Sequence, residues 1–243
     1  NRQSFRGGAQ VDTTEIRDYE FVRNQWFFLE EVYRQGLPDY SDVINPQFRP
    51  EDPIDDSSLQ VYINDFNVNN DAEQLARPGR AQADLADAGN DSTGHREIGT
   101  WHRLDPDNDY VLIDELGYII LRLPVQDRHA LAVTYRTVSG RQVGAVPGAP
   151  DSLQLKLIKA RDARPGFPTW NLEWKNVYKI VRGFSRGRLF DEDKIRVEIL
   201  REVPGKEPEN TQGGTSFLQL LGLDTHGQDP GTRVDQIIDA DYI

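Results

Sequence analysis

One acidic cluster has the residue types and spacing that could bind a metal ion. Asp105, Asp107 and Asp109 are separated by single residues, which matches the opening D-x-D-x-D of a calcium-binding loop. The match then fails, because the sixth position is Tyr110 where the loop requires glycine, and the twelfth is Leu116 where it requires glutamate. The sequence therefore favours an Asp-rich turn that leads into a strand, with calcium binding as the alternative.

The sequence offers few other groups that could do chemistry. It has no cysteine, which removes thiolate nucleophiles, disulfides and Cys-based metal sites. It also lacks the HExxH, GxSxG, GxxxxGK[ST] and GxGxxG motifs. We expect surface or edge positions for the four scattered histidines: His95, His102, His129 and His226. The sequence therefore predicts no catalytic residue and no cofactor, although 40 acidic residues leave a glycosidase-like carboxylate pair open.

The composition limits the partners that the protein could have. A formal net charge of −12 argues against binding to nucleic acid, because phosphate backbones require a basic surface. No apolar run approaches the roughly 20 residues of a membrane-spanning helix. The chain opens on Asn1 without a signal segment, so we expect a processed chain or an excised piece.

Residues 152–203 carry the clearest pattern of secondary structure. Leucines alternate with polar residues over 153–157, which predicts a half-buried strand. Apolar residues recur at helical spacing over 170–182, and alternation returns over 195–199, so we expect a helix and a second strand. The predicted core contains these side chains: Trp26, Leu29, Leu155, Trp170, Trp174, Val177, Ile195 and Val197.

The remaining elements predict an α+β fold. It is a mainly antiparallel β-sheet or sandwich with two or three packed short helices, in one domain over residues 1–243. The expected segments are a loose N-terminus (1–13), a helix (19–33), a strand (59–63), an exposed loop (69–94), two hairpins (110–121 and 130–146) and a short helix (217–224).

Several of these segments resemble one known family. LQLKLIKARDARPGFPTWNLEWKNVYKI, KIRVEILRE and FLQLLGLD, with DYVLIDELGYIILRLPVQDRHALAVTYR and GRQVG upstream, are similar to the SprA family. SprA is the very large outer-membrane translocon protein of type IX secretion and gliding motility. EFVRNQWFFLEEVYR is similar to the aromatic helix ahead of these segments. The resemblance is densest between Asp105 and Asp224, and it does not extend to residues 69–94 or to the acidic tail.

The resemblance implies a piece of a protein-conducting β-barrel protein that has no catalytic residues. Charged residues interrupt most of the predicted strands, so we expect a soluble domain attached to the barrel and not itself membrane-spanning. The implied partners are other parts of the parent barrel protein, translocon subunits or secreted cargo. The implied location is the outer membrane, on its periplasmic or cell-surface side.

A free-standing extracellular carbohydrate-binding β-sandwich is the alternative from another class of protein. Such a module stacks exposed aromatic rings on sugars, and residues such as Trp101 or Tyr110 could do so.

Overall fold

A computed structural model describes most of the chain. The described residues are 2–6, 9–13, 15–35, 52–87, 89–106, 108–114, 116–148, 151–179, 197–221 and 223–224. The chain divides into two compact units, where the sequence led us to expect one domain. The first unit is Asn1–Arg34 with Pro50–Arg182, and the second is Gln35–Arg49 with Gly183–Ile243.

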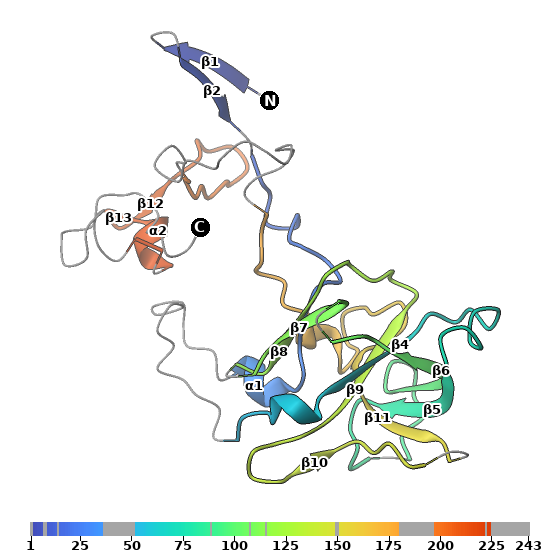
Figure 1. The fold of residues 1–243 in the computed structure, drawn as a ribbon. Coiled ribbons are helices and arrows are strands. Elements are labelled where there is room, and N and C mark those ends of the chain that lie inside the picture. Colours follow the sequence, from blue (N-terminus) through green and yellow to red (C-terminus); the bar gives the residue numbers. More distant parts are fainter. Residues whose placement is uncertain are drawn as a thin grey trace. The chain divides into compact units, whose positions relative to one another are not determined.

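Strands dominate the described elements (Figure 1), which confirms the β-rich α+β fold. In the first unit they are β1 (Arg2–Arg6), β2 (Ala9–Thr13), β3 (Trp26–Phe28), α1 (Glu31–Gln35, whose last residue begins the second unit), η1 (Asp56–Ser58), β4 (Gln60–Asn64), β5 (Arg77–Gln82), β6 (Arg96–Arg103), β7 (Tyr110–Ile113), β8 (Tyr118–Leu121), β9 (Ala130–Arg136), β10 (Gln142–Val143), β11 (Leu153–Lys159) and η2 (Trp170–Leu172). In the second unit they are β12 (Thr211–Gln212), β13 (Thr215–Ser216) and α2 (Phe217–Leu220).

The largest sheet of the first unit closes on itself. Its strand order is β10-β9-β11-β5-β6-β4, and β4 pairs with β9 as well. Strands β9, β11, β5, β6 and β4 therefore form a ring, which we call the closed sheet. Its pairings are antiparallel except for the parallel pairing of β5 with β11. The expectation of a mainly antiparallel sheet is confirmed.

Side chains fill the interior of the closed sheet, as the narrow bore of a five-stranded ring requires. Trp101 of β6 is 1% exposed and is the largest of them. It lies in one cluster with these residues: Tyr62, Ala81, Ala83, Ala130, Ala132, Leu153, Leu155, Leu157 and Ala160. Ala81 of β5 and the alanines of β9 leave room for the indole, so large and small side chains complement one another across the ring.

The outer side of β4 and β9 is buried too. Val61 and Val133 point away from the interior, yet neither has any exposed surface. A second sheet, in the order β3-β8-β7, supplies apolar side chains that are also fully buried, among them Phe27 and Ile119. This sheet contacts the closed sheet where β3 meets β11, which gives the first unit a second layer of core.

The helix predicted over residues 19–33 was wrong. Residues 26–28 form strand β3, which pairs with β8, and only Glu31–Gln35 form a helix, α1. Phe27 lies on one face of β3 and Phe28 on the other, and both are 1% exposed. A strand that is buried on both faces has a continuous run of apolar residues, and a buried helix can have the same run. The sequence therefore did not distinguish the two structures.

The helix predicted over residues 170–182 was also wrong for its described part. Only Trp170–Leu172 form a helical turn, the 3-10 helix η2. Residues 173–177 instead run beside residues 22–27, because Trp174 N donates to Trp26 O (2.9 Å) and Val22 N donates to Val177 O (2.7 Å). Backbone bonds to a distant segment replaced the local bonds of a helix.

Two other segments differ from expectation. Strand β5 lies within residues 69–94, which we expected to be an exposed loop, and β1 pairs with β2 within residues 1–13, which we expected to be loose. The strand expected around Ile195 lies partly outside the described residues, and residues 197–200 form no strand. The predicted strand at 59–63, the two hairpins and the short helix after residue 217 are all present as β4, β7-β8, β9-β10 and α2.

Candidate functional site

The acidic cluster forms a turn that satisfies its own carboxylates. Asp109 Oδ2 accepts a hydrogen bond from the backbone N of Asp105 (2.7 Å), and Asp105 Oδ2 accepts one from Asn108 Nδ2 (2.8 Å). Asp107 lies outside the described residues. Within the described part of the chain, no group of three or more His, Asp or Glu side chains has a geometry that could hold a metal ion. The described geometry is that of the Asp-rich turn.

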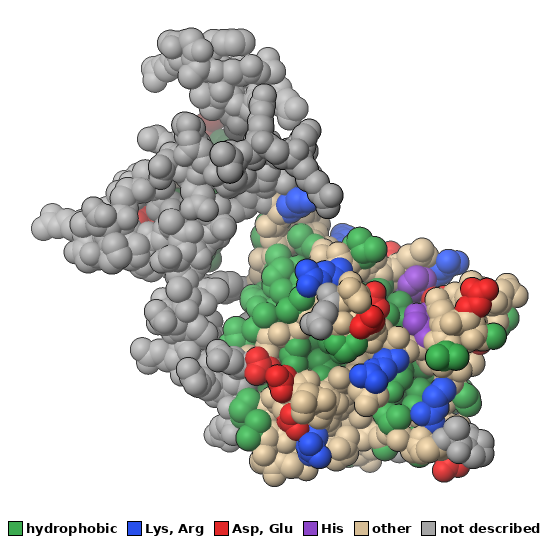
Figure 2. All heavy atoms as spheres, viewed as in Figure 1, with side chains coloured by type: hydrophobic (Ala, Val, Ile, Leu, Met, Phe, Trp, Pro, Cys, Tyr) green, Lys and Arg blue, Asp and Glu red, His purple; other side chains and the backbone are tan. Residues whose placement is uncertain are grey.

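Two histidines lie at one end of the closed sheet, on its outer face. His102 of β6 pairs with Ile63 of β4. The pairing of β4 with β9, continued one residue past β4, sets Asp65 opposite His129. Directly opposed residues share a face, as do alternate residues of one strand, so His102, Asp65 and His129 lie on the same face. Figure 2 shows histidine side chains gathered at one place on the face in view.

These two histidines have perturbed acid–base behaviour. Burial lowers the pKa of His102 and of His129 below their usual value, and the negative charge of Asp65 opposes the effect at both rings. The pKa of Asp65 is itself lowered, because hydrogen bonds from Asn70 and from the backbone of Asn67 outweigh the effect of burial. His95 lies elsewhere, beside Asn90, and His226 is outside the described residues.

A buried lysine joins β11 to the connection before β9, close to this end. Lys159 is 3% exposed, and its Nζ donates to the carbonyl oxygens of Asp127 (2.8 Å), His129 (2.7 Å) and Gln126 (3.3 Å). Burial lowers the pKa of Lys159 to about 8. The three carbonyls satisfy the three N–H donors of the ammonium group, so the side chain fixes the connection before β9.

Further bonds tie the same connection to residues far away in sequence. Asn24 Nδ2 donates to Asp127 Oδ1 (2.7 Å), and the backbone N of Asn24 donates to Glu173 Oε1 (2.6 Å). Asp162 N donates to Asp127 O (2.9 Å). Asn24 and Asp162 adopt positive φ angles of 58° and 48°, which non-glycine residues rarely do. Asn24 and Asp127 therefore join four separate parts of the chain close to Lys159, and side chains hold their irregular backbone.

A second polar network fixes the hairpin β9-β10. Arg141 makes a two-pronged bond to Glu30 (2.8 and 3.2 Å), which connects the hairpin to the residue before α1. Asp52 accepts bonds from Ser139 N (2.9 Å) and Ser139 Oγ (2.7 Å). Hydrogen bonds, foremost from Thr137, hold the pKa of Asp52 below its usual value. Two-pronged Arg–carboxylate pairs fix orientation as well as distance.

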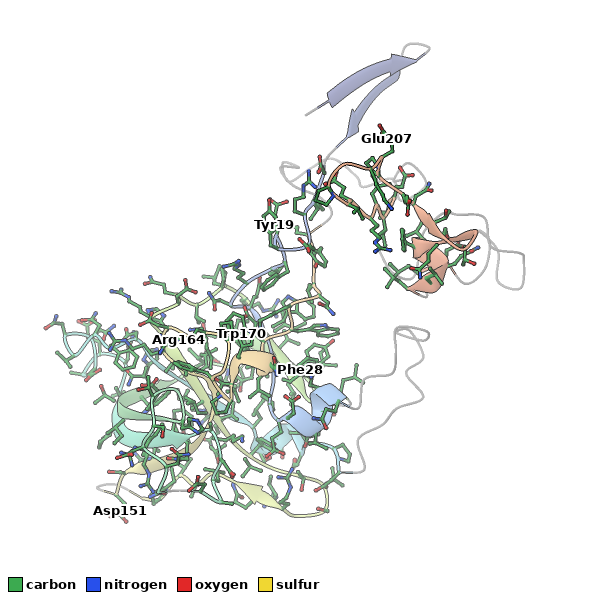
Figure 3. The ribbon with its side chains drawn as sticks, turned by 180° about the vertical axis from the view of Figure 1, so that it is seen from behind. Tyr19, Phe28, Asp151, Arg164, Trp170 and Glu207 are labelled. Atoms are coloured by element: carbon green, nitrogen blue, oxygen red, sulfur yellow. The ribbon has the colours of Figure 1, made fainter. Side chains whose placement is uncertain are left out.

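Four aromatic rings pack together where residues 173–177 cover β3. Trp174 has ring centroids 5.2 Å from Phe28, 5.2 Å from Tyr118 and 5.9 Å from Trp26. Figure 3 labels Phe28 in this region. Trp26, Trp174, Trp170 and Val177 are half-buried, whereas Leu29 and Leu155 are fully buried. Val197 is half-buried in the second unit, and Ile195 is outside the described residues.

The aromatic residues proposed for sugar stacking are not available on the surface. Trp101 is 1% exposed inside the closed sheet, and Tyr110 is 4% exposed at the start of β7. A stacking platform requires an open ring face. Neither Trp101 nor Tyr110 can therefore serve as a stacking platform.

A shallow, polar depression of about 510 Å³ lies beside the hairpin β9-β10. Asp55, Asp56 and Asp114 line it together with Arg136 and Val138. Arg136 pairs with Asp55 across it (2.9 Å). Hydrogen bonds from Ser57 and Arg136 hold the pKa of Asp55 below its usual value. The depression offers charge and hydrogen bonding but little apolar surface to enclose a small molecule.

The sequence did not identify the structural roles of Lys159, Asn24 or Asp65. A bulge between Leu157 and Lys159 turns Lys159 away from the face of Leu153, Leu155 and Leu157, so their alternation gave no signal for its buried position. Asn24 bonds to partners that lie 103 and 149 residues away in sequence. The position of Asp65 depends on the register of three strands. No local pattern reports such contacts.

Neither described helix has the length and the apolar character that crossing a membrane requires. No protein-family model matches the chain, and no curated protein is similar enough to count as a match.

Proposed function

We propose that this chain is a structural and interaction domain of a SprA-like outer-membrane translocon, serving type IX secretion and gliding motility, without catalytic turnover of its own. In this proposal it contacts the rest of the parent barrel protein, translocon subunits or secreted cargo. It works at the outer membrane, on the periplasmic or cell-surface side. The resemblance between Asp105 and Asp224 supports the choice of parent protein.

The observation that carries an interaction role is that polar side chains hold the irregular connections in place. Lys159 fixes the connection before β9, and Arg141 and Asp52 fix the hairpin after it. These groups bind the protein's own backbone and side chains, so they give the first unit a defined surface shape. Rigid connections on a closed sheet are suited to recognition by shape.

Exposed apolar side chains on these connections support contact with another protein. Leu75 is 84% exposed, Leu123 79%, Val68 74% and Val138 69%. They lie on the connections between β4 and β5, β8 and β9, and β9 and β10. Apolar side chains presented on fixed loops bind partners with little loss of conformational entropy.

Site-specific photo-crosslinking in the source cells tests the interaction role. A photoreactive phenylalanine analogue at Leu75, Leu123 or Val138 is expected to yield defined adducts with translocon or cargo proteins. The same analogue at the exposed, polar Glu73 is the matched control. If none of the three apolar positions gives an adduct above that control, the interaction role fails.

The complete open reading frame tests the parent protein separately. A SprA-like parent requires a very large reading frame with many alternating strand segments around this piece. A frame without them would remove the SprA-like assignment and leave the crosslinking result to be explained by another parent.

A further inference from the structure

We propose that His102 and His129 form an acid-sensitive latch at one end of the closed sheet, which holds the connections around it at neutral pH and loosens them when both rings become protonated. The inference concerns the folded state of the chain and does not depend on the proposed function.

The first support is the placement of the two rings. His102 lies beside Ile63 of β4, and His129 directly precedes β9, whose first residue, Ala130, pairs with Asn64 at the end of β4. The two rings are close enough for a charge on His102 to act electrostatically on His129. Two imidazoles that share one face become two like charges when both are protonated, and like charges in a half-buried position repel.

The second support is a nitrogen atom that has no partner. Nδ1 of His129 is buried and makes no hydrogen bond to any described residue. In the neutral ring this atom can remain an acceptor, whereas a protonated ring must carry an N–H there. A buried N–H without an acceptor is costly, so the unprotonated ring fits this position better.

The charges around His129 add to this cost. Arg128 and Lys159 both disfavour its protonation, and only Asp65 favours it. The carbonyl oxygen of His129 is also one of the three that bind the Lys159 ammonium group. A proton on the ring therefore adds positive charge beside a buried cation, in the connection that this cation holds.

His102 faces a different set of charges. Asp65, Asp71 and Asp109 all favour its protonation, yet burial outweighs them and lowers its pKa. Asp65 also begins the turn over residues 65–70, where its carboxylate oxygens accept hydrogen bonds from Asn67 N (2.9 Å) and Asn70 Nδ2 (2.8 Å). A charged His102 competes with these two donors for the same carboxylate, which links its protonation to that turn.

The direction of the pH effect follows from proton binding. Both histidines have folded-state pKa values below 6.5. The unfolded or opened chain therefore binds more protons than the closed chain in the pH range from those folded-state pKa values up to about pH 7.5. The latch is therefore fully stabilising at neutral pH and weakens as the pH falls through this window. The lowered pKa of Asp65 affects stability only below the usual carboxyl value of 3.8, which lies outside the pH range in which the histidines titrate.

Two measurements on the whole chain test the latch. NMR titration of the histidine rings is expected to give pKa values below 6.5 for both His102 and His129. Hydrogen exchange, corrected for its intrinsic pH dependence, is expected to accelerate at residues 65–70 and 126–129 between pH 7.5 and 5.5, by up to about tenfold for each ring. The double variant His102→Gln/His129→Gln is expected to lose this acceleration, and His95→Gln is expected to keep it.

Three results would overturn the inference. One is a pKa of 6.5 or higher for both rings, which needs no variant and so does not depend on whether a variant folds. Another is wild-type exchange at these residues that is independent of pH between 7.5 and 5.5. The last is a double variant that folds and retains the wild-type acceleration.

Discussion

Trp101 and Gly79 fit against each other inside the closed sheet. The indole Nε1 donates to the carbonyl oxygen of Gly79 at 3.3 Å. A Cβ atom at Gly79 would stand 3.0 Å from the indole ring and 2.8 Å from the Cβ atom of Leu153. The absence of a side chain at Gly79 therefore makes room for the largest residue of the interior.

Gly79→Ala is expected to destabilise the protein by about 1–3 kcal/mol, because the added methyl group overpacks the interior between Trp101 and Leu153. Chemical denaturation followed by tryptophan fluorescence measures this change. Gly89→Ala is the control, since nothing lies within 4 Å of a Cβ there, and its effect should remain within about 0.5 kcal/mol. Equal effects of the two substitutions would contradict the packing.

Gly117→Ala is expected to be more damaging than Gly140→Ala. Both glycines have positive φ, 70° and 93°, so alanine is strained at either position. At Gly117 the new Cβ atom would also overlap the ring of Tyr33, whereas nothing lies within 4 Å at Gly140. The Gly140 variant should lose about 1–2 kcal/mol. A Gly117 variant as stable as the Gly140 variant would show that Tyr33 does not pack there.

Lys159→Met is expected to destabilise the protein by about 1–3 kcal/mol, because it removes the donor that the carbonyl oxygens of Gln126, Asp127 and His129 share. The loss should be concentrated in the connection before β9, where faster amide exchange at residues 126–129 measures it. Lys179→Met, at an exposed position, provides the control for removal of one positive charge. Unchanged exchange at 126–129 would show that Lys159 does not hold this connection.

Trp174→Ala is expected to cost about 2–4 kcal/mol, because the ring packs against Trp26, Phe28 and Tyr118. Thermal unfolding measures the change. Tyr19→Ala removes a ring that is 64% exposed and should leave the melting temperature nearly unchanged. If the two substitutions have the same small effect, residues 173–177 do not cover β3 in solution.

Calcium is expected to give no binding heat at millimolar concentration. The carboxylates of Asp105 and Asp109 already accept hydrogen bonds within their own turn, and these would have to break for a cation. Calorimetric titration of the whole chain measures binding. Heat that disappears in the double variant Asp105→Asn/Asp109→Asn would restore the calcium loop.

The sequence predicted the strands whose two faces differ in environment. Leu153, Leu155 and Leu157 are fully buried, while Gln154 is exposed, so their two-residue alternation was visible. Strand β5 was missed because its inward positions hold Gly79 and Ala81, which complement the indole of Trp101. Small residues that face a large side chain across a sheet do not produce the alternation of apolar and polar residues that marks a strand.

The two predicted helices failed for a related reason. The aromatic residues of β3 and of residues 173–177 are spaced as on a helix, but their backbones bond to segments 92 and 148 residues away. The candidate latch was equally invisible, because the sequence shows His102 and His129 only as isolated histidines. Their common face becomes apparent only from the register of β6, β4 and β9.

The parallel pairing of β5 with β11 also has a consequence for biosynthesis. The ribosome delivers β4, β5, β6 and β9 before β11, so β5 and β9 keep open backbone edges until residue 159 has emerged. At about 5–20 residues per second, the gap between the end of β9 and the end of β11 lasts roughly 1–5 s. During those seconds the nascent chain exposes strand edges that can pair with other chains. Closure of the ring therefore competes with such pairing until β11 is complete.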